Sequence, residues 1–190
     1  MKDKRIGFGI TGSHCTLEKI IGPMQKLIDD GNEVWPIVSP SVRDCDTRFG
    51  TARHWLEQIE SICQRPVIEN IVTAEPVGPK LNLDIMVLAP CTGNTIAKLA
   101  LGITDTAVTM AAKAQLRNRR PVLLAIATND GLAANAKNIG LLMDKKHVYF
   151  VPFGQDDPVG KPTSVVAHFD LLLKAMEAAL AEQQIQPLLR

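Results

Sequence analysis

Apolar and polar positions alternate along this chain in two ways. Short apolar runs predict strands at 6–10, 34–39, 83–89 and 121–127, a last strand at 148–151 and a weaker one around 67–68. Segments with helical patterning predict helices at 17–28, 55–63, 94–101, 106–116, 129–145 and 165–181. Strands that alternate with helices are typical of βαβ units, which build parallel sheets.

The order of these elements predicts an α/β fold of the flavodoxin-like, doubly wound kind, a three-layer sandwich around a parallel sheet. The chain has 190 residues, of which 46% are hydrophobic, and this is enough for one substantial core. We therefore expect a single domain over residues 1–190. The stretch Thr73–Lys80 holds two prolines and a glycine and is expected to be a loop.

Small hydroxyl and amide side chains follow four of the predicted strands, in the loops 11–14, 39–41, 90–95 and 127–130. In an open parallel sheet a ligand lies beyond the carboxyl ends of the strands, where the strand order reverses. Free N–H groups at the starts of the following helices favour an anion such as a phosphate. Helix caps use the same residue types, but four such loops at one edge favour a phosphate-bearing ligand over capping alone.

Few residues in these loops could transfer protons. His14 could contact a ligand oxygen or be a partly exposed loop histidine, and Asp130 could act on a substrate or cap the next helix. Thr128 and Asn129 precede Asp130 and are candidate binding residues. Cys91 is expected to be a buried packing thiol. Two further residues have simpler structural explanations: Asp105 as a helix N-cap, and His54 as a surface residue.

Charge and cysteine usage exclude several classes of protein. Lys and Arg total 21 against 20 Asp and Glu, so no net field would attract nucleic acid or an anionic membrane. The cluster Arg117, Arg119 and Arg120 is interpreted as a solvated helix end. The four cysteines contain no C-x-x-C pair, which indicates neither a zinc site nor a disulfide framework. With no signal peptide or membrane-length apolar run, we expect a cytoplasmic protein.

The sequence contains a match to the dinucleotide-binding motif, but not in the structural context that the motif requires. Gly7, Gly9 and Gly12 satisfy G-x-G-x-x-G, but the first two fall inside the predicted strand rather than in the turn after it. The second strand ends in Ser39, where a nicotinamide-binding fold places an acidic residue for the ribose. A nicotinamide site in this chain is therefore not expected.

Two segments resemble a known family. Gly9-Ile-Thr-Gly-Ser13 before a helix, and Ala89-Pro-Cys-Thr-Gly-Asn-Thr-Ile-Ala-Lys-Leu-Ala100, are similar to the flavoprotein family of FMN-dependent cysteine decarboxylases and flavin prenyltransferases. The resemblance implies an FMN phosphate held by the first loop and the end of the second strand. It also implies a homo-oligomer, a trimer or a multiple of one, formed through helices near the Asn-Thr pair. The positions that match the family's binding residues are Gly12, Ser13, Ser39, Pro90, Thr92, Asn94 and Thr95.

One branch of the family is matched over nearly the whole chain, including segments 74–80 and 127–138. This resemblance implies a protein that acts with a partner subunit in the mother-cell cytoplasm of a spore-forming bacterium. The pair would convert a dihydrodipicolinate-level precursor to dipicolinic acid, with NADP held by the partner. The cysteine decarboxylases of the family carry a Pro-x-Met-Asn-x-x-Met-Trp clamp after the fifth strand, whereas the corresponding stretch here is Ala127–Asp130. No cysteine follows Cys91 either, so decarboxylation of a peptidyl cysteine is not expected. A self-sufficient FMN enzyme and a non-catalytic assembly subunit remain alternatives.

Overall fold

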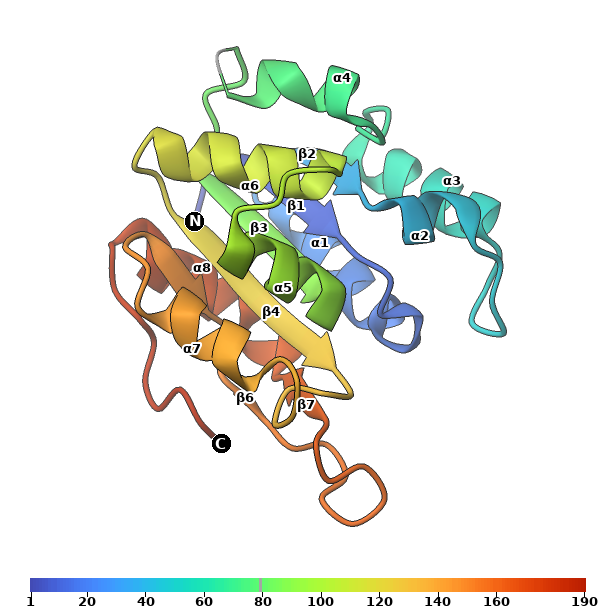
Figure 1. The fold of residues 1–190 in the computed structure, drawn as a ribbon. Coiled ribbons are helices and arrows are strands. Elements are labelled where there is room, and N and C mark those ends of the chain that lie inside the picture. Colours follow the sequence, from blue (N-terminus) through green and yellow to red (C-terminus); the bar gives the residue numbers. More distant parts are fainter. Residues whose placement is uncertain (79) are drawn as a thin grey trace.

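A computed structural model describes residues 1–78 and 80–190. Within them, a seven-stranded sheet has the order β2-β1-β3-β4-β7-β6, and β5 pairs with β4 as well. The strands are β1 (Arg5–Ile10), β2 (Glu33–Val38), β3 (Ile85–Cys91), β4 (Val122–Thr128), β5 (Val148–Phe150), β6 (Phe153–Gly154) and β7 (Val165–Ala167). The strands β1 to β5 pair in parallel in the order 2-1-3-4-5, which is flavodoxin-like and confirms the predicted fold class (Figure 1).

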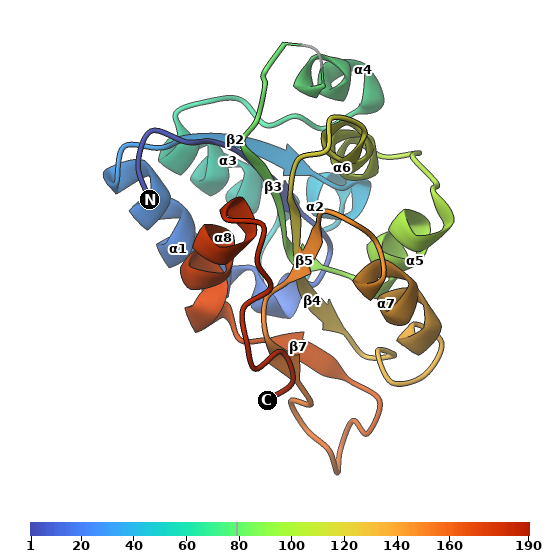
Figure 2. The same ribbon diagram turned by 90° about the vertical axis from the view of Figure 1, so that its left-hand side faces the viewer.

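Helices cover both faces of this sheet (Figure 2). One layer holds α1 (Glu18–Asp29), α3 (Ala52–Cys63) and α8 (Leu172–Leu180). The other holds α5 (Gly93–Leu101), α6 (Ala107–Arg117) and α7 (Ala136–Met143). The short helix α2 (Pro40–Asp44) follows β2, and α4 (Ile71–Ala74) packs on the outside of α6. The result is the three-layer arrangement that the sequence predicted.

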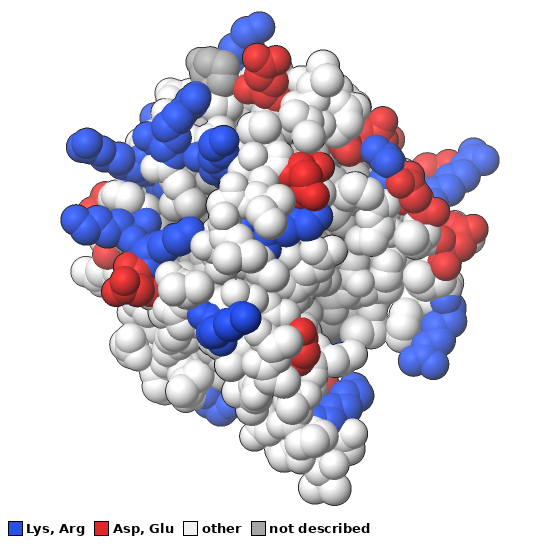
Figure 3. Space-filling model, viewed as in Figure 1, with Lys and Arg blue, Asp and Glu red and all other residues white. Residues whose placement is uncertain are grey.

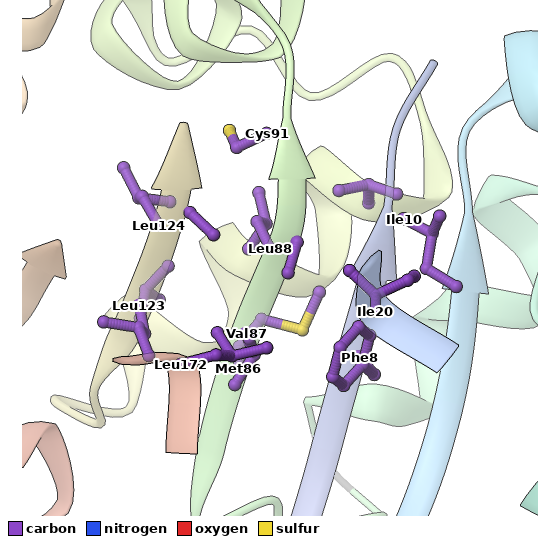
Figure 4. Packing of buried hydrophobic residues seen from close by; sticks show 14 of the residues in the cluster. Phe8, Ile10, Ile20, Met86, Val87, Leu88, Cys91, Leu123, Leu124 and Leu172 are labelled. Carbon is purple, nitrogen blue, oxygen red and sulfur yellow. The ribbon is translucent and has the colours of Figure 1, made fainter. Parts of the chain in front are cut away.

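The core lies on both sides of β3, whose seven residues are all buried. Figure 4 shows side chains of β1, β3 and β4 packed together, among them Phe8, Leu88 and Leu124. Leu172 of α8 and Ile20 of α1 join them from one helical layer. An apolar strand covered on both faces is the arrangement expected at the centre of a parallel sheet. The core therefore holds the strand ends of β1 and β3 in fixed positions.

Two predictions in the first half of the chain are wrong. The weak strand around 67–68 is a single bridge between Ile37 and Ile68, too short to form a strand. The predicted loop Thr73–Lys80 instead contains the end of α4 and a 3₁₀ turn at Glu75–Val77, while Pro79 lies outside the described residues. Proline is tolerated in the first turn of a helix, because the N–H it lacks has no partner there. The proline at 76 therefore did not prevent helical structure.

The larger error concerns the C-terminal region. The strand at 148–151 is not the last, because β6 and β7 follow it, and residues 165–167 of the predicted helix belong to β7. β5 pairs only with Val122–Leu124, which leaves the end of β4 open, and β7 pairs there with Ala127 and Thr128 in antiparallel orientation. The adjacent β-branched residues Val165 and Val166 suit a strand. Similarly, only Ala136–Met143 of the predicted helix 129–145 is α-helical.

The charged surface agrees with the expected solvated helix end. Figure 3 shows Lys and Arg side chains gathered over the C-terminal end of α6, where Arg117 and Arg119 lie. Arg120 donates a hydrogen bond from Nη1 to the carbonyl oxygen of Leu83 at 2.6 Å. This bond attaches the connection between α6 and β4 to the segment that precedes β3. In the part of the chain that the structure describes, no helix is both long and apolar enough to cross a membrane.

Candidate functional site

The loops after β1 and β3 are joined at the point where the strand order reverses. Thr11 Oγ1 donates a hydrogen bond to the carbonyl oxygen of Pro90 at 2.8 Å and accepts one from the N–H of Thr92 at 2.9 Å. The N–H of Thr11 also donates to Pro90 at 3.2 Å. Because Thr11 is buried, these bonds are shielded from water. Thr11 therefore holds the first and third predicted loops together.

The loop after β2 approaches the same place. Ser39 and Ser41 lie with their Oγ atoms 2.9 Å apart, and a Cβ atom added to Gly12 would collide with the Ser41 side chain. Only glycine allows this close approach of the first and second loops. The two hydroxyls and the Gly12 backbone therefore lie side by side at the strand ends.

Helix α5 begins at this edge with Gly93. Its N-cap, Thr92, makes no side-chain capping bond in the described structure; instead its Oγ1 donates to Thr95 Oγ1 at 3.3 Å. The first N–H groups of an α-helix have no partner within the helix and carry partial positive charge. The start of α5 can therefore offer N–H donors to an anion.

Two cavities lie on either side of Thr92. The smaller, which we call the hydroxyl cavity, has a volume of about 390 Å³. Its walls are formed by Ser39, Pro40, Ser41, Asp44, Cys45, Thr92, Asn94, Thr95, Lys98 and Thr106. The larger, the charged cavity, has a volume of about 520 Å³. Its walls include Gly12, Ser13, His14, Arg48, Phe49, Thr92, Thr128, Asn129, Asp156, Lys161 and Ser164.

The structure thus brings most of the predicted binding residues to two neighbouring cavities. Ser39, Asn94 and Thr95 line the hydroxyl cavity, and Thr92 lines both. The other predicted residues in the charged cavity are Gly12, Ser13, His14, Thr128 and Asn129. Pro90 is buried beneath the loops, where its carbonyl oxygen receives Thr11. The four strand ends lie at one edge, but the cavity walls divide their residues into two groups.

His14 is the candidate proton carrier that faces a cavity. Its Nδ1 atom is buried without a hydrogen-bond partner in residues 1–78 and 80–190. Burial lowers the pKa of the imidazole from its ordinary value of 6.5, so the neutral form predominates at neutral pH. A neutral imidazole with a free nitrogen can accept a proton or a hydrogen bond from a ligand.

Asp130 has a different place. Thr128 Oγ1 donates to its Oδ1 at 2.5 Å and Asn135 Nδ2 donates to its Oδ2 at 2.8 Å. The N-cap of α7 is Asn135, so Asp130 does not cap that helix as one alternative proposed. Among the described residues it is absent from the walls of both cavities. Its carboxylate braces the loop that presents Thr128 and Asn129.

Two further expectations can be compared with the structure. Thr106, not Asp105, is the N-cap of α6, because its hydroxyl accepts from the N–H of Thr109 at 3.2 Å. Asp105 forms an ion pair with Lys98 at 2.9 Å, and hydrogen bonding from Lys98 lowers the pKa of the Asp105 carboxyl. Cys91 is fully buried as expected, and burial raises the pKa of its thiol far above the ordinary value. His54 is exposed, as predicted.

The sequence reasoning missed the residues that charge the larger cavity. Arg48 and Phe49 come from the segment between α2 and α3, and Asp156 and Lys161 from the β6–β7 connection. A signal for the second group was present, since Asp156-Asp-Pro-Val-Gly-Lys-Pro162 is rich in turn residues. Because residues 165–167 were assigned to a helix rather than to β7, the sequence did not show that the β6–β7 connection lies at the strand ends.

Comparisons with known proteins identify the family of this chain. The Flavoprotein family model matches residues 1–177. The chain is 52% identical to the B subunit of dipicolinate synthase from Bacillus subtilis (strain 168) over 189 residues, which cover 100% of this chain and 94% of that protein. The crystal structure of the dipicolinate synthase B subunit from Bacillus halodurans superposes with a TM-score of 0.91 at 47% identity, over 100% of this chain and 97% of that one.

A more distant structure shares the fold. DmrB of Burkholderia xenovorans in complex with FMN, described as a cubic protein cage for redox transfer, superposes with a TM-score of 0.69 at 22% identity, over 94% of this chain and 96% of that one. From the family model over most of its length and the full-length relatives, the chain belongs to the Flavoprotein family, within the group that contains the dipicolinate synthase B subunits.

Proposed function

We propose that this chain is the B subunit of a dipicolinate synthase and acts with a nicotinamide-binding A subunit in a sporulating bacterium. The proposed reaction oxidises a dihydrodipicolinate-level precursor to dipicolinic acid in the mother-cell cytoplasm. The observation that carries this proposal is the 52% identity to the B subunit of a dipicolinate synthase over the whole chain. The two cavities at the strand ends supply the places where cofactor and substrate would bind.

The strand-end residues fit an FMN phosphate in the hydroxyl cavity. Ser39, Ser41 and Thr92 offer hydroxyl donors there, and the start of α5 adds backbone N–H groups. The absence of a side chain at Gly12 lets the first loop pack directly against Ser41, one of these hydroxyl donors. When bound, FMN would supply a two-electron acceptor for the dihydropyridine ring. DmrB, which has the same fold, was crystallised in complex with FMN, and this supports FMN as the ligand.

We propose that NADP is held by the partner subunit. Gly7 and Gly9 lie inside β1, where Cβ atoms would come within 2.7 and 2.8 Å of the Met86 side chain. Packing against Met86 therefore explains these glycines without a dinucleotide. Within the charged cavity, the proposed proton acceptor is His14, whose imidazole lines the wall and, in its neutral form, could take the proton that leaves the dihydropyridine ring during oxidation.

The outer face of α5 and α7 supports the expected homo-oligomer, a trimer or a multiple of it. Leu101 is 68% exposed and Leu141 is 52% exposed, with Ile103 nearby in the chain also exposed. α5 and α7 pack against each other, so these apolar side chains belong to one region of the surface. Replacing Leu101 and Leu141 together by Glu is expected to shift the sedimentation coefficient to that of a smaller species. A wild-type monomer would contradict the proposal.

The test of function combines a spectrum with an assay. The purified chain is mixed with FMN, freed of excess by gel filtration and examined for a retained flavin band. The A subunit, NADP and a dihydrodipicolinate-level precursor are then added, and dipicolinate is measured by ultraviolet absorption. Retained flavin and product formation only with both subunits are expected. Activity without the A subunit would indicate a self-sufficient FMN enzyme, and undiminished activity of a His14→Ala, Thr92→Ala variant would indicate an assembly subunit.

A further inference from the structure

The charged cavity has cationic side chains on two separate turns. Arg48 comes from the segment between α2 and α3, and Lys161 comes from the connection between β6 and β7. In Figure 3, basic side chains are visible on the segment that projects to the right and just above the uncharged tip of the segment that projects downward. Asp156 is the acidic residue of the walls, and burial favours the neutral form of His14. The cavity therefore carries a net positive charge at neutral pH.

Arg48 and Phe49 occupy the tip of a tight turn that the fold holds in place. Thr47 and Gly50 close the turn with two backbone hydrogen bonds of 3.0 and 3.1 Å. Gly50 has a φ of 135° and sits against the buried Trp55, whose Nε1 would lie 2.8 Å from a Cβ atom at this position. Only glycine suits this backbone and this contact. The turn is thus anchored to α3 and presents its two central side chains to the cavity.

The Arg48 guanidinium is not held in an ion pair by the part of the chain that the structure describes. It lies over the ring of Phe49 at 4.8 Å from the centroid. Phe49 is 42% exposed, which is high for a large apolar ring. A guanidinium that stacks on an exposed ring can turn toward a carboxylate and leave the ring face for a flat ligand.

Lys161 is positioned from the opposite segment. Its N–H donates to the carbonyl of Asp157 at 2.8 Å, and its Nζ is 3.4 Å from Asp156. Hydrogen bonding from Ser164 is the main cause that lowers the pKa of Asp156, so this carboxylate stays ionised and orients the lysine. The ammonium keeps donors free for a second anion, since Lys has three.

We propose that Arg48 and Lys161 bind the two carboxylates of a planar ring dicarboxylate, with Phe49 against the face of the ring. This inference rests on the proposed function, because it makes the charged cavity the substrate site beside the cofactor. Two carboxylates match two cations on separate turns, whereas a single phosphate would use the hydroxyl cavity and the start of α5. A dianion would bind more tightly than a monoanion because only the dianion can pair with Arg48 and Lys161 at the same time.

The test uses pyridine-2,6-dicarboxylate and pyridine-2-carboxylate as probes, titrated calorimetrically into the full chain with and without FMN. The wild-type chain is expected to bind the dicarboxylate at least about tenfold more tightly than the monocarboxylate. Arg48→Met and Lys161→Met should each remove about tenfold of the affinity for the dicarboxylate and most of this preference. Phe49→Leu should weaken both ligands by about threefold.

Arg53→Met is the matched control, because Arg53 is exposed, follows the same turn and pairs with Glu57 outside the cavity. Equal affinities of the wild type for the two probes, or unchanged affinities in Arg48→Met, would overturn the proposal. Loss of the flavin band in Arg48→Met with the dicarboxylate preference intact would also overturn it, because the guanidinium would then serve the cofactor. Failure of the proposed function has a separate signature, since the wild type would then retain no flavin and form no product with the A subunit.

Discussion

The two sides of the strand-end edge are built differently. On the side of the hydroxyl cavity, Thr11, Thr92 and the Ser39–Ser41 pair form short hydrogen bonds that bring several hydroxyl groups together, and Asp44 and Lys98 also lie in the walls. On the side of the charged cavity, the walls carry charged side chains from two segments, Arg48 from the segment between α2 and α3 and Asp156 and Lys161 from the β6–β7 connection. The first arrangement uses backbone and hydroxyl donors, which suit a phosphate wherever this fold occurs. The second uses long side chains, which can change without disturbing the sheet and can therefore select a substrate.

The largest effect is expected where the two sides meet, at Gly93. A Cβ atom there would lie 2.5 to 2.8 Å from Thr128 Oγ1, Asn135 Nδ2 and Asp130 Oδ1. Gly93→Ala should therefore lower the free energy of unfolding by about 2 to 3 kcal/mol and abolish flavin retention. Urea unfolding and the flavin spectrum measure the two effects.

Gly22→Ala is the control for that substitution. Gly22 lies in α1 with nothing within 4 Å of an added Cβ, so the change should stabilise the chain by roughly 0.5 to 1 kcal/mol. A Gly93→Ala variant as stable as Gly22→Ala would show that the two sides are not packed tightly against each other.

The next effect tests the rigidity of the β1–β3 side. Thr11→Val leaves the N–H of Thr92 without its buried acceptor and should cost about 2 kcal/mol. Flavin retention should fall more than affinity for pyridine-2,6-dicarboxylate, because Thr11 supports the cofactor loops. Thr11→Ser keeps the hydroxyl and should restore most of both. Equal decreases in flavin retention and in affinity for pyridine-2,6-dicarboxylate would mean that the hydroxyl cavity and the charged cavity are not independent.

Asp130→Asn tests the other side. The change replaces one acceptor oxygen by a donor facing Thr128 or Asn135, and should lower the free energy of unfolding by about 1 kcal/mol. Turnover with the A subunit, measured below the unfolding transition, should stay within about threefold of wild type. A loss of turnover by a hundredfold or more, with stability unchanged, would instead make Asp130 catalytic.

The smallest effect is the pH dependence contributed by His14. Its pKa is lowered in the folded state, so the unfolded state binds more protons below the ordinary pKa of 6.5. This contribution to stability is complete above pH 6.5 and is lost as the pH falls through the lower folded pKa. His14→Gln should therefore lose less stability than wild type between about pH 7.5 and about pH 5.5 in urea unfolding. Parallel pH profiles would refute burial of this imidazole.

Local pattern was sufficient for the parallel half of the molecule. The apolar runs placed β1 to β5 within one or two residues, because these strands are covered on both faces and their side chains carry the burial pattern directly. Polar loops after four strands indicated one binding edge, since parallel strands necessarily end together. The motif around Asn94 and Thr95 added the family, which the full-length comparisons confirm.

Tertiary structure decided the rest. Val165 and Val166 join a strand only because β5 is too short to cover the end of β4, and this depends on a partner distant in sequence. The same pairing brings Lys161 to the cavity that Arg48 also lines. Asp130 became a brace rather than a cap because Thr128 and Asn135 converge on it. The sequence by itself determined the layers, the edge and the family, whereas long-range pairing determined which side chains form each cavity, because such contacts leave no local periodicity.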